Sequence, residues 1–147
     1  MNIVKVCTAD LEIINDILVN YIEAEDKEEQ LPGVAYLHTL LGDDRSYLFA
    51  AIEENAVRGY ALVYRFPSLY SSHYLAYLYD IEVSPLYRRK GIGTLLIQKV
   101  LERLRQDNVK ELWLGTAIDN AGGQGLFRAT GAVKSEEAFN DYTYYLG

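Results

Sequence analysis

The chain has 147 residues, of which 50% are hydrophobic and 24% charged, a composition typical of one globular domain with a sizeable core. Its net charge of −7 disfavours nucleic acid as a partner and favours cationic molecules. No apolar run approaches the ~20 residues that a membrane-spanning helix needs, so we expect no membrane partner.

The first residues and the cysteine usage favour a cytoplasmic location. Residues 1–14 have neither the basic stretch nor the long apolar core of a secretory signal peptide. Cys7 is the only cysteine, so no disulfide can form within the chain. We predict that Cys7 is a core residue of a first strand rather than a nucleophile. His38 and His73 lack partners at metal-ligand spacing, so no metal site is predicted.

The N-terminal third is predicted to be helical. Residues 8–29 form a helix in this prediction, with Thr8 as its N-cap. Residues 34–41 form a second, shorter helix that ends at Gly42. The acidic stretch 23–29 is most simply a solvated helix face, and the alternative is the rim of a site for a cationic substrate. The apolar side chains at helical spacing, which we expect to point inward, are Leu11, Ile14, Leu18, Ile22, Leu37, Leu40 and Leu41.

The middle of the chain is predicted to form strands. Residues 46–54 and 59–66 indicate an antiparallel hairpin, and Pro67 breaks the pattern. Residues 72–83 are aromatic and β-branched and favour a long strand that ends at the Ser84–Pro85 pair.

The last third is predicted to alternate between helices and strands. Residues 92–108 form an amphipathic helix, 111–117 a buried strand, and 120–132 a glycine-rich helix. Residues 132–137 and 141–147 are predicted to form two closing strands. The apolar stripe of the 92–108 helix consists of Ile92, Leu95, Leu96, Val100 and Leu104.

The strand–helix–strand unit from residue 74 to 117 implies two parallel strands joined by a right-handed crossover. We therefore predict an α/β fold of the α+β mixed-sheet kind, with helices on both faces of the sheet, in one domain over residues 1–147.

The turn before the 92–108 helix, "RRKGIG" at residues 88–93, is suited to binding phosphate. A helix N-terminus has free backbone N–H groups and a partial positive charge. Gly91 and Gly93 would let a phosphate approach the backbone, and Arg88, Arg89 and Lys90 add charge. A plain turn with solvated cations is the alternative. Neither the Rossmann nor the P-loop pattern is present.

Two spaced motifs resemble those of the GNAT superfamily of N-acetyltransferases. Arg88, Gly91 and Gly93 match its acyl-CoA signature, Q/R-x-x-G-x-G/A. The order of elements also fits from residue 1 to 147, and "YLYDIEV" at 77–83 resembles the aminoglycoside 3-N-acetyltransferase branch most. The second motif, N-x-x-A-x-x-L-Y-x-x-x-G-F, falls without a gap on Asn120, Gly123, Leu126, Phe127, Gly131 and Ala132.

The resemblance implies a GNAT acyl-CoA N-acyltransferase fold with a splayed central pair of parallel strands that holds acetyl-CoA as co-substrate. Backbone groups of Ile81 and Val83 would hold the pantetheine arm, and those of residues 88–93 the pyrophosphate. Asn120 would contact the carrier near its thiol. The expected carrier-binding residues are Ile81, Val83, Arg88, Arg89, Lys90, Gly91, Ile92, Gly93, Thr94, Asn120 and Phe127. For Ile81 and Val83 core packing is a second interpretation.

Asp80 is the predicted catalytic base and Glu82 its backup. Acetyl transfer needs a neutral amine, and a carboxylate can take the amine's proton directly or through water. The two side chains share a face if the strand is regular, whereas a bulge would break that parity. The N–H of Val83 is the candidate donor to the oxyanion. In the aminoglycoside branch the residue matching Asp80 contacts the substrate amine.

Phe127 departs from the family's pattern, in which a Tyr protonates the departing thiolate. Phe has no hydroxyl to donate. A CoA thiol with a pKa of roughly 8.5 leaves tolerably without help. Water, a nearby Tyr such as Tyr87, or no acid at all are the alternatives. Ala132 stands where the family usually has Phe.

We therefore predict acetyl transfer from acetyl-CoA to a primary amine of a small, polycationic acceptor such as an aminoglycoside or a polyamine. One alternative is a protein acetyltransferase that acts on a lysine or an N-terminus. Another is a non-catalytic acyl-CoA-binding module, for which Phe127 is the best support. Members of the family often dimerise, so a homodimer is the oligomer that the resemblance suggests, although the sequence does not fix the oligomeric state.

Overall fold

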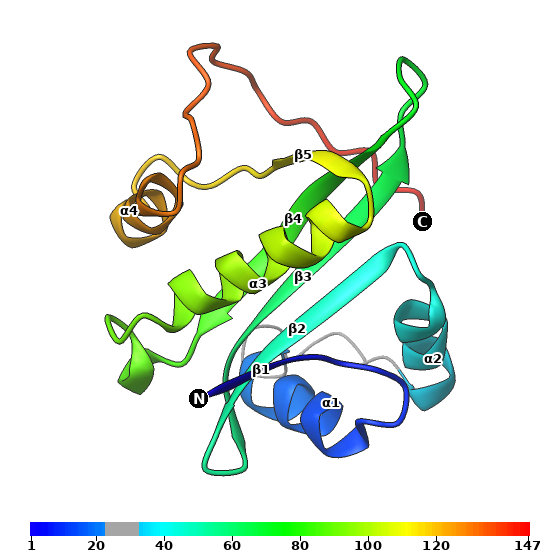
Figure 1. Cartoon of the computed structure of the whole chain (residues 1–147), viewed down its shortest axis with the longest axis vertical. Coiled ribbons are helices and arrows are strands. Elements are labelled where there is room, and N and C mark those ends of the chain that lie inside the picture. Colours follow the sequence, from blue (N-terminus) through cyan, green and yellow to red (C-terminus); the bar gives the residue numbers. More distant parts are fainter. Residues whose placement is uncertain (23–32) are drawn as a thin grey trace.

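A computed structural model of the chain describes residues 1–22 and 33–147. Within these residues the strands form one five-stranded sheet in the order β1-β2-β3-β4-β5 (Figure 1). Neighbouring strands are antiparallel except β4 and β5, which are parallel. The strands are β1 (Asn2–Lys5), β2 (Ser46–Glu53), β3 (Ala56–Pro67), β4 (Tyr74–Val83) and β5 (Val109–Trp113).

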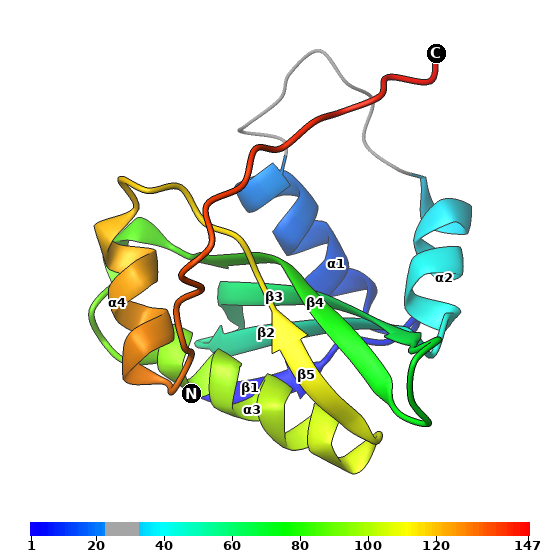
Figure 2. The same cartoon turned by 90° about the horizontal axis from the view of Figure 1, so that it is seen from above.

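Helices cover both faces of the sheet, as predicted for a mixed α/β fold (Figure 2). On one face lie α1 (Leu11–Ile17), its π-helical continuation η1 (Leu18–Ile22), and α2 (Val34–Gly42). On the other lies α3 (Ile92–Gln106), with α4 (Ala121–Ala129) packed against it. A short 3₁₀ helix, η2 (Pro85–Tyr87), leads from β4 to α3. We call the two sides the α1 face and the α3 face.

The apolar stripe of α3 differs from the predicted one at one position. Ile92, Leu96, Val100 and Leu104 are buried as expected. Leu95 is 41% exposed, and Ile97 is buried in its place. Since an apolar stripe is about 100° wide, positions at its margin cannot be assigned from spacing alone.

The parallel strands β4 and β5 are splayed. They pair only from Tyr74 to Tyr77 on β4, and β5 ends at Trp113. From Leu78 to Val83, β4 has no partner on β5 within the described residues. This opening between two parallel strands confirms the predicted splay.

The start of the chain corrects three predictions. The first helix begins at Leu11 after Asp10, so Thr8 is not its N-cap. Cys7 is exposed and its backbone N–H donates to Asp10, because β1 ends at Lys5 and Val6 takes the core position. Leu11 is also exposed rather than inward. The acidic stretch 23–29 lies outside the described residues.

The two ends of the predicted β region differ as well. The hairpin turn is Glu54–Asn55, both with positive φ, so β3 begins at Ala56 rather than residue 59. The predicted strand 111–117 ends at Trp113, which is 42% exposed rather than buried. The predicted strands 132–137 and 141–147 do not form, and these residues are exposed. Their residues favour strands, but a strand also needs a partner that completes its hydrogen bonds.

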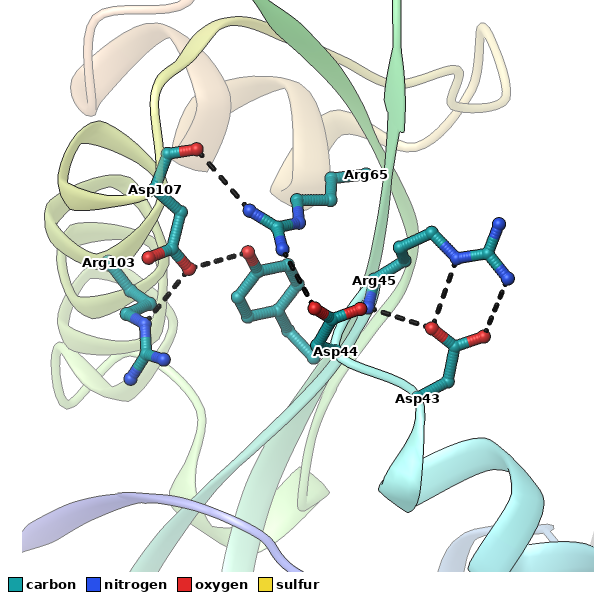
Figure 3. Close-up of polar contacts among 7 residues, drawn as sticks. Asp43, Asp44, Arg45, Arg65, Arg103 and Asp107 are labelled. Carbon is teal, nitrogen blue, oxygen red and sulfur yellow. Dashed lines mark hydrogen bonds and ion pairs between the residues drawn. The ribbon is translucent and has the colours of Figure 1, made fainter.

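A polar contact ties the end of α3 to the sheet (Figure 3). The Tyr47 hydroxyl donates to the Asp107 carboxylate at 2.6 Å, and Arg103 Nε donates to the same oxygen at 3.0 Å. Burial by itself raises the pKa of the Asp107 carboxyl, but these two hydrogen bonds outweigh burial and leave the pKa lowered. Burial and the bond to Asp107 raise the pKa of Tyr47.

Tyr47→Phe is expected to reduce the free energy of unfolding by about 1.5 kcal/mol, because it removes a donor to a charged acceptor. The loss should be present above pH 4 and should shrink as the pH falls through the lowered folded-state pKa of Asp107, where the carboxylate is protonated. Urea unfolding at pH 7 and pH 3 measures this. Tyr70→Phe, at a tyrosine that is 93% exposed, is the matched control. An equal loss at both pH values would contradict the prediction.

Candidate active site

A cleft of about 680 Å³ opens beside the splay, where the end of β4, the following turn, and the N-termini of α3 and α4 meet. It gathers every predicted carrier-binding residue except Lys90. Its lining consists of Ile81, Glu82, Val83, Tyr87, Arg88, Arg89, Gly91, Ile92, Gly93, Thr94, Asp119, Asn120, Ala121, Gly122, Gly123, Leu126 and Phe127.

The turn before α3 has the backbone shape that favours glycine at Gly91. Gly91 is the N-cap residue of α3 and has a φ of +84°, in the left-handed region. Nothing lies within 4 Å of where its Cβ would be, so the neighbouring space is open. The N–H groups of the first turn, including those of Ile92 and Gly93, have no intrahelical acceptors. The open space and these donors together suit an anionic group.

Gly93 has a different role from the one predicted. A Cβ there would lie 3.0 Å from the Leu126 side chain, which belongs to α4. The missing side chain therefore lets α3 and α4 pack closely. Gly93 contributes its N–H to the cleft, but the space beside its Cα is already filled by Leu126.

The three cations of the turn are placed differently from one another. Arg88 is bound to the end of β4, with Nε donating to the Val83 carbonyl at 3.0 Å and Nη2 to Glu82 Oε1 at 2.9 Å. Arg89 lines the cleft. Lys90 Nζ lies 5.0 Å from the centre of the Tyr87 ring. Arg88 thus fixes the strand end, whereas Arg89 and Lys90 are placed around the turn.

Asp80 and Glu82 share a face, as predicted. A β-bulge places Tyr79 outside the pairing with β3, because Leu62 pairs with Asp80 and Val63 with Leu78. The bulge precedes Asp80, so alternation from Asp80 onward is regular. The Tyr60 hydroxyl, from the α1 face, donates to Asp80 Oδ2 at 2.5 Å. Ile81 and Val83 pack into the core on the α3 face.

Glu82 touches both sides of β4. It lines the cleft beside the splay, which we call the carrier cleft because of the predicted carrier-binding residues that it gathers, and also a second cleft of about 480 Å³ on the side of α1. The residues described as lining these two clefts do not include Asp80. The second cleft is lined by Asp16, Asn20, Tyr21, Ala56, Val57, Arg58, Glu82, Ser84 and Pro85.

Asn120 and Phe127 come to the cleft from α4. Asn120 is its N-cap residue: Oδ1 accepts from the Gly123 N–H at 3.0 Å, and Nδ2 donates to Thr116 at 2.9 Å. This cap explains both motif positions structurally, because a Cβ on Gly123 would meet the Asn120 side chain. Phe127 is half-buried against the core.

The arrangement agrees with one known family. Residues 11–132 match the family described as the acetyltransferase (GNAT) family. The chain belongs to the GNAT acetyltransferase family. The match spans both predicted motifs and both splayed strands, β4 and β5.

The GNAT chain is similar to solved structures over nearly its whole length. An aminoglycoside acetyltransferase from an uncultured soil metagenomic sample, in complex with sisomicin, is 26% identical with a TM-score of 0.87. The similarity covers 98% of this chain and 95% of that one. The aminoglycoside N-acetyltransferase AAC(6′)-Iy in complex with CoA shares the fold, at 18% identity and a TM-score of 0.74 over 98% of this chain and all of that one.

Curated relatives match over shorter stretches. The [ribosomal protein bS18]-alanine N-acetyltransferase of Escherichia coli K12 is 34% identical over 56 residues, or 38% of each chain. The thialysine N-epsilon-acetyltransferase of Bos taurus is 37% identical over 82 residues, or 56% of this chain and 48% of that one. The GNAT chain thus spans less than half the length of these relatives.

The sequence did not indicate the contact of Tyr60 with Asp80. Tyr60 lies on β3, and its position opposite the end of β4 depends on the register in which β3 and β4 pair. A tyrosine-rich strand carries no signal that separates this residue from its neighbours. Tyr60 is therefore a neighbour of the predicted base that the GNAT motifs do not include.

Two further observations concern only the described parts of the GNAT chain. None of its helices there is both long and apolar enough to cross a membrane. No three His, Cys, Asp or Glu side chains there are grouped closely enough to hold a metal ion.

Proposed function

We propose that the protein transfers the acetyl group of acetyl-CoA to a primary amine of a small, polycationic acceptor. The observation that carries this proposal is the cleft at the splay, which joins unpaired β4 backbone, a helix N-terminus and the strand-end carboxylate of Glu82. The similarity to an aminoglycoside acetyltransferase structure supports this class of acceptor.

In this proposal the carrier is held mainly by backbone groups. The edge of β4 from Leu78 to Val83 has no β5 partner, so its polar groups on that edge can bond to the amides of pantetheine. The N–H groups at the start of α3 receive the pyrophosphate, and Arg89 and Lys90 add charge. Asn120 lies at the N-terminus of α4, on the other side of the same cleft.

The chemistry is direct attack by the amine on the thioester. Asp80 takes the proton from the ammonium group, directly or through water, and Glu82 is the backup base. The N–H of Val83 stabilises the oxyanion, and CoA leaves as a thiolate with a pKa of roughly 8.5. The second proton of the attacking nitrogen passes to this thiolate or to water, which leaves the neutral amide and CoA. Tyr87 lies on the turn that would hold the pyrophosphate, so it is poorly placed to protonate the thiolate at the far end of pantetheine.

A thiol-release assay with acetyl-CoA tests the proposal. The acceptor panel is sisomicin, spermidine and a peptide with an N-terminal alanine. We expect release of thiol with sisomicin or spermidine at a rate well above that of hydrolysis. Calorimetric binding of CoA without turnover on any acceptor would identify a non-catalytic acyl-CoA-binding module instead.

A second candidate function is acetylation of a protein N-terminus, which the similarity to an alanine N-acetyltransferase favours. The same panel separates the two, because that enzyme would act on the peptide and not on sisomicin. The homodimer, the cytoplasmic location and the single domain over residues 1–147 stay predictions, and light scattering tests the first of these.

Phe127→Tyr is expected to be tolerated and to raise turnover if protonation of the thiolate limits the rate. Phe127 lines the carrier cleft and is half-buried, so an added hydroxyl can reach the cleft without disturbing the core. Steady-state thiol release measures the change. An unchanged turnover would show that another step limits the rate. A loss of CoA binding would contradict the expected placement of the added hydroxyl.

A further inference from the structure

One half of the α1 face is left uncovered by helices. The core cluster beneath α1 and α2 takes its strand residues from β1, β2, the start of β3 and the loop after β1. In Figure 2 both helices lie over that half of the sheet, away from β5. On the remaining half, over β3, β4 and β5, lies a group of aromatic side chains that we call the aromatic floor: Tyr64, Phe66, Tyr77, Tyr79 and Trp113.

The rings of the floor touch one another edge-on. The centre of the Trp113 ring lies 5.4 Å from that of Phe66 and 5.5 Å from that of Tyr77. Tyr64 and Tyr79 are 5.8 Å apart. Trp113 is 42% exposed and Tyr79 67%, so ring surface remains open to solvent. Single exposed aromatic residues are common, but a contiguous group of five is typical of a binding surface.

The charge of this half-face indicates which ligand it suits. Asp80 lies on the floor's side of β4, and Glu111 lies on the floor's side of β5, since it pairs with Leu75. The described side chains at paired positions on this face, from Leu62 on β3, from Leu75 to Asp80 on β4 and from Glu111 on β5, include no basic residue. Arg65 of β3 lies over Tyr47 and Tyr74, on the α3 face, and the exposed Lys110 lies at the irregularity of β5 before Glu111. Ring faces and carboxylates both attract cations. The floor therefore favours an organic ammonium ion over a neutral or anionic ligand.

The floor also lies next to the proposed base. Tyr79 precedes Asp80 in the chain, and Tyr77 is about two strand steps, roughly 7 Å, from Asp80 on the same face. An acceptor that carries several amino groups can therefore place one on the floor and another at the Asp80 carboxylate.

We infer that the aromatic floor binds the acceptor through an ammonium group that is not acetylated, held against the ring faces of Trp113 and its neighbours. This inference names residues for the acceptor and rests on the proposed function. A molecule with a single amine lacks the second point of attachment, so the floor selects polyamines of sufficient length or aminosugars.

Trp113 gives a direct measurement, because it is the only tryptophan of the chain. We would titrate the full chain with sisomicin in the absence of acetyl-CoA and follow the tryptophan emission. Trehalose, a neutral disaccharide, is the matched control ligand. The expected result is a saturable change with sisomicin and none with trehalose at the same concentration. An equal response to both sugars, or no response to sisomicin, would overturn the inference.

Tyr79→Leu removes the aromatic ring of Tyr79 but keeps an apolar side chain at this position. It therefore tests the ring itself. It should weaken sisomicin binding about fivefold, which corresponds to about 1 kcal/mol, the usual scale of a cation–π contact. CoA affinity should stay unchanged. Tyr70→Leu, at an exposed tyrosine in the β3–β4 loop, is the matched control and should bind sisomicin like the unaltered chain. Equal affinity of the Tyr79 variant and the control would contradict the role of the ring.

The outcomes also separate this inference from the proposed function. If sisomicin releases thiol from acetyl-CoA but leaves the Trp113 emission unchanged, the proposed function stands and the aromatic floor does not bind the acceptor. If sisomicin changes the emission and binds more weakly to the Tyr79 variant, yet no amine releases thiol, the floor is confirmed and the proposed function is wrong.

Discussion

Asp80→Asn is expected to lower turnover with a cationic amine about 100-fold or more, the usual scale for loss of a general base. Asparagine keeps the shape and can still accept the hydrogen bond from Tyr60, so the fold should be intact. It loses the charge and most of the basicity. CoA affinity should change little, because in the proposed function backbone groups and cations hold the carrier.

The pH dependence makes the Asp80 prediction specific. An alkylamine has a pKa of about 10.4, so a larger fraction of acceptor is neutral at high pH and needs no base. The deficit of Asp80→Asn should therefore shrink as the pH rises from 7 to 9.5. A deficit that is constant with pH would indicate a positioning role instead.

Glu82→Gln is the comparison variant. Glu82 is ion-paired with Arg88 at the strand end, so its loss should also loosen the turn. We expect a smaller loss of turnover than for Asp80→Asn, with part of the loss in CoA affinity. Glu82 lines both clefts and Asp80 lines neither of them, so the reverse order of effects would transfer the role of base to Glu82.

Gly91→Val is expected to weaken CoA binding tenfold or more, about 1.4 kcal/mol. Valine is β-branched and strained at a φ of +84°, so the turn must shift away from the shape that we propose binds the pyrophosphate. The added side chain also occupies the open space beside the first N–H groups of α3. Isothermal titration with CoA measures the loss.

Gly131→Val is the matched control for strain. Gly131 has a φ of +99° and open space around its Cα, but it does not line the carrier cleft. Both variants should lose stability to a similar degree, whereas only Gly91→Val should lose CoA affinity. Unchanged CoA affinity in a folded Gly91→Val protein would contradict the assignment of the turn.

Elements with a strong local signal were predictable from the sequence. Clear hydrophobic periodicity marks the 46–66 hairpin, the long strand after it and the helix from Ile92. Pro and Gly residues lie close to the ends of these elements and mark where they stop or start. The motifs around Gly91 and Asn120 led to the GNAT family, which the family match over residues 11–132 confirms. The predicted closing strands failed because strand propensity does not specify a pairing partner.

The Gly91 turn and the pair of carboxylates on β4 differ in how far the local sequence specifies them. The turn at Gly91 is built from consecutive residues, so its glycines and cations could be recognised by spacing alone. The sharing of a face by Asp80 and Glu82 depends on where the bulge falls, and that follows from the pairing of β4 with β3.

The sequence by itself determined the family, the order of most elements and the residues of the Gly91 turn, because these follow from periodicity and from contiguous motifs. Only the tertiary structure decided that Gly93 makes room for Leu126, that Tyr60 binds Asp80, and that Trp113 meets Tyr77. Each of these contacts joins residues from different elements, and their alignment is set by strand register and helix packing. Since a shift of one residue turns a side chain to the other face of the sheet, such contacts exist only once the whole sheet has formed.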